Sequence, residues 1–144
     1  MREILFRGKR KDNDEWVYGY YVFDDSGQIT EEPTAYIYYL NTHPCGFNLI
    51  PYEVIPETVG QYTGLTDKNG QKIFEGDIVK IKTSSNGCET TEITRVGYDI
   101  KFCGFFPMHW EESCDGCDCY FSIKEIEIIG NIHDNPELLG GEEE

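Results

Sequence analysis

Apolar and polar residues alternate along the first part of the chain, and this period-2 pattern predicts strands that bury one face. Ile4 and Phe6 alternate with polar neighbours, and the apolar positions of a second segment alternate from Trp16 to Val22. The polar residues 11–14 between the two segments predict a turn. The chain is therefore expected to open with a β-hairpin.

Further apolar segments follow before residue 56. Residues 36–40 are aromatic and β-branched and are bounded by turn residues, so they predict another strand. Prolines interrupt the apolar pieces at 47–50 and 54–55 and restrict them to short or edge strands. We expect these elements to form an N-terminal β-rich subdomain over residues 1–55.

Turn signals are concentrated between residues 56 and 79. Asn69-Gly70 separates two apolar runs, and this pair predicts a hairpin because both residues tolerate positive φ. Asp67 begins that turn, and Asp77 follows Gly76 in a second tight turn. We therefore expect both carboxylates to bind backbone amides rather than to act in catalysis. The predicted structural turn positions of this region are Gly60, Gly64, Asp67, Asn69, Gly70, Gly76 and Asp77.

From residue 56 onward the spacing of strands predicts a small, strongly bent SH3-like barrel. Its expected strands are residues 72–74, 77–83, 92–99, 100–106 and 120–132. Residues 134–139 predict a helix of one or two turns, in which Asp134 or Asn135 is the cap and Pro136 takes the first helical position. The predicted class is α+β, mainly β, with a barrel-type domain over residues 56–139 and an acidic tail over 140–144.

Three groups of motifs resemble the YopX family. The central group is Val59-Gly60-Gln61-Tyr62-Thr63-Gly64-Leu65, then residues 67–70, then Ile73-Phe74-Glu75-Gly76-Asp77-Ile78-Val79. Residues 128–139 resemble the family's closing motif, although His133 stands where an aromatic residue is expected, and residues 4–10 with 16–19 fit its usual start. The resemblance implies a protein encoded by a bacteriophage or prophage. It carries no established biochemical activity.

The charge of the chain is strongly and unevenly negative. The net charge is −15, and residues 57–144 contain 18 Asp and Glu against 7 Lys and Arg. Such a surface repels phosphate backbones, so direct nucleic-acid binding is disfavoured. The excess of acid serves solubility, or it forms an acidic face that mimics DNA against a basic host protein.

No part of the sequence predicts attachment to a membrane. No stretch approaches the roughly 20 apolar residues that a membrane-spanning helix needs. Charged residues interrupt the N-terminus, which therefore lacks the apolar core of a signal peptide. We expect a cytoplasmic protein of the bacterial host cell.

A cysteine cluster is the one stretch that resembles a reactive site. Cys114, Cys117 and Cys119 have the spacing of a zinc knuckle, and His109 or Cys103 could supply a fourth ligand. A second ligand pair is missing, however, and the acidic neighbours would raise the pKa of the thiols unless a metal is bound. The alternative is that all six cysteines are reduced thiols. We therefore expect no cofactor, with zinc as the alternative.

The remaining polar residues do not form a catalytic constellation. His43, His109 and His133 are scattered, and none has a Ser or Cys beside it in a nucleophile motif. The short aromatic strands suit a core or a subunit interface, or they could stack on a ligand. The sequence therefore predicts a non-enzymatic protein-interaction module that forms a homo-oligomer and binds an unknown host or phage protein.

Overall fold

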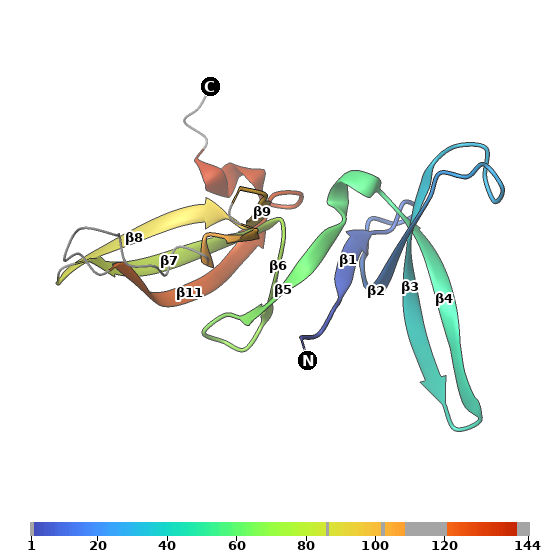
Figure 1. Ribbon diagram of the computed structural model, residues 1–144, viewed down its shortest axis with the longest axis horizontal. Helices are drawn as coiled ribbons and strands as arrows, with labels where there is room; N and C mark the ends of the chain where they lie inside the picture. Colours follow the sequence, from blue (N-terminus) through green and yellow to red (C-terminus); the bar gives the residue numbers. More distant parts are fainter. Residues whose placement is uncertain (1, 86, 102, 109–120, 141–144) are drawn as a thin grey trace. The chain divides into compact units, whose positions relative to one another are not determined.

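The computed structural model describes residues 2–85, 87–101, 103–108 and 121–140, and it is mainly β (Figure 1). Contacts divide the chain into two compact units, residues 1–62 and 63–144. The sequence-based boundary between residues 55 and 56 lies a few residues before this division. Among the described residues, no helix is long and apolar enough to cross a membrane.

Unit 1 is an antiparallel sheet with the strand order β4-β3-β2-β1-β5. Its elements are β1 (Phe6–Lys9), β2 (Trp16–Asp24), β3 (Thr34–His43), β4 (Gly46–Val54), the 3-10 helix η1 (Pro56–Thr58) and the start of β5 (Gly60–Thr66). β2 changes partner at Gly19: residues 16–19 pair with β1 and residues 20–24 pair with β3. A Cβ atom at Gly19 would overlap the carbonyl oxygen of Tyr38, so this crossing requires glycine.

The sheet of unit 1 curls so that the end of β4 meets the end of β1 and the residues that follow it. Val54 at the end of β4 forms an isolated antiparallel bridge with Arg10. The backbone N–H of Lys11 donates to the carbonyl of Glu53 at 3.0 Å, and the N–H of Ile55 donates to the carbonyl of Lys9 at 2.9 Å. The inner face of this curled sheet holds the core, which consists of Ala35, Ile37 and Val54 packed against Phe6, Val17, Tyr21 and Val59. β1, β2, the first part of β3 and the end of β4 therefore direct side chains into the core of unit 1.

Unit 2 contains a three-stranded antiparallel sheet with the order β11-β7-β8, a small β10-β9 pair and the hairpin of β5 with β6. Its elements are β6 (Lys72–Phe74), β7 (Asp77–Ser85), β8 (Cys88–Arg95), β9 (Gly97–Asp99), β10 (Gly104–Phe106), β11 (Phe121–Asn131) and the 3-10 helix η3 (Pro136–Leu139). The core contains the buried residues Ile73, Val79, Ile81 and Val96, against which Met108, Ile126 and Ile128 pack.

The expected SH3-like barrel is not confirmed. Among the described residues, β9 and β10 pair only with each other, and the sheets of unit 2 do not close. The predicted strand over residues 92–99 is two strands, because Val96 lies between β8 and β9 and exchanges hydrogen bonds with Gly76 and Asp77, at the start of β7. Its N–H donates to the carbonyl of Asp77 at 2.8 Å, and its carbonyl accepts from the N–H of Gly76 at 2.8 Å.

The helix of one or two turns expected over residues 134–139 is not confirmed. Pro136–Leu139 is a single 3-10 turn with proline at its start. Asn135 occupies the N-cap position but makes no side-chain cap bond, because its Oδ1 accepts from the N–H of Asn131 at 3.4 Å. Four residues before Gly140 are too few to stabilise an α-helix without strong capping.

Candidate functional site

Asp67 fixes the hairpin of β5 and β6 to a distant strand. Its Oδ1 accepts hydrogen bonds from the backbone N–H groups of Asn69 and Gln71, both at 2.9 Å. Its Oδ2 accepts from the N–H of Ile128 in β11 at 3.1 Å. Beside it, the N–H of Lys68 donates to the carbonyl of Ile126 at 2.9 Å. A single buried carboxylate thus joins a local turn to a strand 61 residues further along the chain.

The protonation of Asp67 follows from these contacts. The side chain is only 7% exposed, and burial by itself disfavours the charged carboxylate. The amides of Ile128, Gln71 and Asn69 outweigh burial and hold the pKa of Asp67 below its ordinary value. The group is therefore an ionised hydrogen-bond acceptor at neutral pH, and a carboxylate with a lowered pKa is a poor general base.

The other predicted turn positions also have backbone roles. Gly64, Gly70 and Gly76 have φ of 93°, 82° and 90°, in the left-handed region that favours glycine. Asp77 is 2% exposed, and its Oδ2 accepts from the N–H of Phe74 at 2.8 Å. Gly60 pairs with Arg7 of β1. Asp67 and Asp77 are the buried carboxylates of the described residues, and both bind backbone amides.

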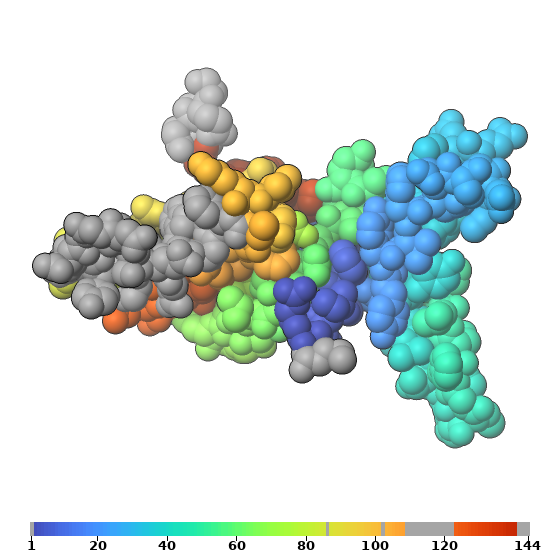
Figure 2. Space-filling model, in the orientation of Figure 1, coloured from blue at the N-terminus to red at the C-terminus, as the bar shows by residue number. Residues whose placement is uncertain are grey.

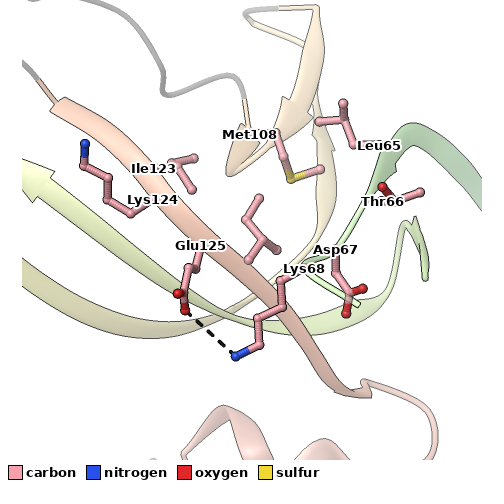
Figure 3. Close-up of a pocket in the computed structure, with 9 residues that line it drawn as sticks. Leu65, Thr66, Asp67, Lys68, Met108, Ile123, Lys124 and Glu125 are labelled. Carbon is pink, nitrogen blue, oxygen red and sulfur yellow. Dashed lines mark ion pairs between the residues drawn. The ribbon is translucent and has the colours of Figure 1, made fainter. Parts of the chain in front are cut away.

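An open groove of about 330 Å³ lies beside β11 in unit 2 (Figure 3). Its apolar lining comes from Leu65, Met108, Ile123 and Ile126, and Met108 extends over it. At its rim the Nζ of Lys68 lies 3.9 Å from Glu125 and 3.6 Å from Glu127. These surface ion pairs each contribute little, about 0–1 kcal/mol. The groove is lined by polar and charged as well as apolar side chains, and it lies at the lower end of the usual size range of small-molecule sites, about 300–1,000 Å³.

A second candidate surface covers the outer face of unit 1, which we call the aromatic face. It consists of Tyr18, Tyr20 and Val22 on β2 and Tyr36 and Tyr38 on β3, all on the side opposite the core. Tyr20 stands opposite Tyr38 in the register, and Val22 stands opposite Tyr36. The three β2 side chains are 43–52% exposed, and the rings of Tyr36 and Tyr38 lie 6.3 Å apart. Large apolar side chains are therefore presented to solvent on a backbone that the core holds in place.

Cationic side chains border this face on β1. The Arg7 guanidinium lies 4.6 Å from the ring centre of Trp16, and the Lys9 ammonium lies 5.6 Å from the same ring. Such cation–π contacts hold charge beside an aromatic surface. Arg7 is itself buried, with 6% exposure, so of these two cations Lys9 is the one that is partly exposed beside the aromatic face.

The predicted metal ligands Cys114, Cys117, Cys119 and His109 lie outside the described residues. Of the other cysteines, Cys45, Cys88 and Cys103 are free and exposed. Within the part of the chain that the structure describes, no group of three or more His, Cys, Asp or Glu side chains could hold a metal ion.

The remaining predicted positions belong to turns. The N–H of His133 donates to Oδ1 of Asn131 at 3.0 Å, and Pro136 begins η3. The sequence analysis identified the aromatic strands but not which of their side chains face solvent. The register of β2 with β3, together with burial of the opposite face, supplies that answer.

Comparisons with known proteins agree with this architecture. The crystal structure of protein EF1440 from Enterococcus faecalis matches with a TM-score of 0.51 and 22% sequence identity, over 96% of this chain and 99% of that one. This likeness shows the fold alone. No curated protein matches the chain. The model of the YopX family, described as YopX protein, matches residues 5–140, and the chain therefore belongs to the YopX family.

Proposed function

We propose that this protein is a non-enzymatic protein-interaction module, encoded by a phage or prophage, that binds a partner protein in the cytoplasm of the bacterial host. The observation that carries the proposal is the exposure of Tyr18, Tyr20 and Val22 on the aromatic face. Contiguous exposed apolar surface on a folded protein marks an interaction site, whereas scattered exposed residues do not.

The composition of the aromatic face matches that of a protein interface. Tyrosine and arginine are enriched at such interfaces, and a few buried aromatic side chains carry most of the binding energy. Tyr20 is at the centre of the face, with Tyr38 across the strand and Val22 beside it. Because both strands bury their other face in the core of unit 1, these side chains need little ordering when a partner binds.

Electrostatics limits the kind of partner. A net charge of −15 raises the rate of encounter with a basic protein and lowers it for an acidic one. The partner that fits is a protein with a net positive charge and an apolar patch that can cover the aromatic face.

Photo-crosslinking and variants of the aromatic face test this function. A photoreactive amino acid at Tyr20 would trap the partner in the bacterial host, and the purified partner would then be titrated by calorimetry. We expect Tyr20→Glu to weaken binding at least tenfold, because it places a carboxylate in the apolar contact. The matched control is Ile29→Glu, at a side chain of unit 1 that is 71% exposed in the loop after β2. Equal affinity of both variants would refute the proposal.

Two alternative functions are favoured by specific features of the sequence. The spacing of Cys114 and Cys117 favours a zinc-stabilised binding module, and elemental analysis giving about one zinc per chain, lost on Cys114→Ser with Cys117→Ser, would support it. The acidic excess of residues 57–144 favours an inhibitor that mimics DNA. Competition between the protein and DNA for a basic host protein would distinguish this second alternative.

A further inference from the structure

A hairpin arm extends from unit 1, and it consists of residues 39–50 of β3 and β4. The two strands pair in one continuous register from Ala35 with Val54 to His43 with Gly46. β2 pairs with β3 only as far as Tyr38, because β2 turns away at Gly19. Among the described residues, no third strand pairs with the arm. The arm is visible as the ribbon that carries the β3–β4 turn in Figure 1 and as a narrow turquoise projection in Figure 2.

The arm is poor in charged residues compared with the rest of the chain. Residues 33–52 contain no Asp, Glu, Lys or Arg, although these four types make up 27% of the chain. Four large side chains of the arm are exposed: Tyr39 at 47%, Leu40 at 40%, Phe47 at 69% and Leu49 at 47%. A two-stranded hairpin is at best marginally stable alone in water, so a long apolar arm of this kind is expected to gain stability from a partner.

No strand of the described part of the chain pairs with the outer edge of β4 along the arm. At the base of β4, Glu53 and Ile55 bond to Lys11 and Lys9 on the side away from β3. Backbone polar groups point to alternate sides along a strand, so Phe47, Leu49 and Pro51 direct theirs to the same outer side. Phe47 and Leu49 offer an N–H and a carbonyl each, whereas Pro51 has no N–H. The open segment that can extend the sheet is therefore 46–50.

We propose that the occupant of this edge is a second copy of the chain, paired antiparallel through β4 with Asn48 on the two-fold axis. In this register the N–H and carbonyl of Phe47 bond to the carbonyl and N–H of Leu49 in the second copy, and the symmetric pair repeats these bonds. The side chains of Phe47 and Leu49 then become cross-strand neighbours on one face. Pro51 lies opposite Cys45 of the turn, so pairing ends where the donor is missing.

Charge selects a second copy over a different protein. Two copies of the chain, each with a net charge of −15, repel each other wherever their acidic surfaces meet. The arm contains no Asp or Glu, so two arms can pair without bringing carboxylates together. A basic partner would find no carboxylate on the arm to pair with. The edge is also self-complementary, as an isologous two-fold contact requires.

The first test measures the mass of the full chain by sedimentation, with and without changes to the arm. We expect the wild type to be a dimer and Phe47→Glu with Leu49→Glu to be a monomer with an unchanged circular dichroism spectrum. The matched control is Ile100→Glu, at an aliphatic side chain outside the arm that is 83% exposed, and it should remain dimeric. A monomeric wild type, or a dimer that survives the arm changes, would overturn the proposal.

The second test checks the register. On a chain with Cys45→Ser, Asn48→Cys places two thiols across the two-fold axis, where opposed Cα atoms lie about 4.5 Å apart and can form a disulfide. Thr42→Cys on β3 is the control, because its strand does not face the second copy and the other cysteines are the same in both chains. We expect a disulfide-linked dimer for Asn48→Cys alone. Equal crosslinking of both variants would contradict pairing through β4.

The proposed self-association and the proposed binding of a host or phage protein can be refuted independently of each other. The dimer depends on Phe47 and Leu49, whereas the proposed function depends on Tyr20. Loss of the dimer in the arm variant with unchanged binding of the partner protein would support the self-association on its own. Capture of a different protein on the arm of a monomeric chain would overturn it.

Discussion

Replacement of Asp67 by asparagine tests whether this buried carboxylate holds unit 2 together. The Asn carbonyl can keep the two bonds that Oδ1 accepts from Asn69 and Gln71. Its NH₂ group then replaces Oδ2 and faces the N–H of Ile128, so two donors confront each other at a site that is 7% exposed. The hydrogen bond that joins the turn to β11 is thereby lost.

The size of the effect follows from the kind of bond that is removed. Hydrogen bonds to charged groups contribute about 1.5–3 kcal/mol, and an unsatisfied buried donor costs a similar amount. We therefore expect Asp67→Asn to lower the free energy of unfolding by about 2–3 kcal/mol at pH 7. Urea unfolding followed by circular dichroism measures it, and Asp25→Asn, at an exposed loop carboxylate, is the matched control with no measurable change expected.

The pH dependence provides an independent check. The folded-state pKa of Asp67 is lower than its unfolded-state pKa of about 3.9, so its stabilisation is complete well above pH 3.9 and is lost as the pH falls through the folded-state pKa. The difference in stability between wild type and Asp67→Asn should therefore shrink between pH 6 and pH 3. A variant as stable as Asp25→Asn at pH 7, or a difference that grows on acidification, would refute the reasoning.

Two further substitutions test unit 1. Gly19→Ala should destabilise the fold by about 3 kcal/mol or more in thermal melts, because the added Cβ would overlap the carbonyl oxygen of Tyr38. The control is Gly97→Ala, which has open space around the added Cβ and should be close to neutral in the same melts. Thr58→Val should cost about 1–2 kcal/mol in urea unfolding, because the buried hydroxyl donates to the Ile55 carbonyl at 2.6 Å and accepts from the Lys9 N–H at 2.9 Å. A neutral result at Thr58 would show that water replaces both bonds.

The turn chemistry of the central region was predictable because it is local. Asn69-Gly70 and the glycines with positive φ are determined by the conformations that four or five neighbouring residues can adopt. The same reasoning suggested that Asp67 and Asp77 bind amides of nearby residues. Local reasoning did not predict the third hydrogen bond of Asp67, because its donor Ile128 is 61 residues away and no local pattern specifies that contact.

The barrel prediction was not confirmed for a related reason. Apolar spacing shows that a segment can be a strand but not which strand it pairs with. Val96 interrupts the expected strand, and its backbone bonds to Gly76 and to Asp77 at the start of β7. The C-terminal segment likewise had a suitable cap and proline, yet its length allowed only the 3-10 turn of Pro136–Leu139.

By itself the sequence determined the mainly β class, the turns and the family, because alternation, turn residues and motifs are read within a few positions. Only the tertiary structure decided which aromatic side chains are exposed. β2 is apolar on both faces from Trp16 to Phe23, so its pattern does not distinguish the core side from the solvent side. Closure of the sheet at Arg10 and Val54 buries one face, and the bend at Gly19 leaves the β3–β4 arm without a third strand. Both depend on contacts between distant residues, which strand propensity does not encode.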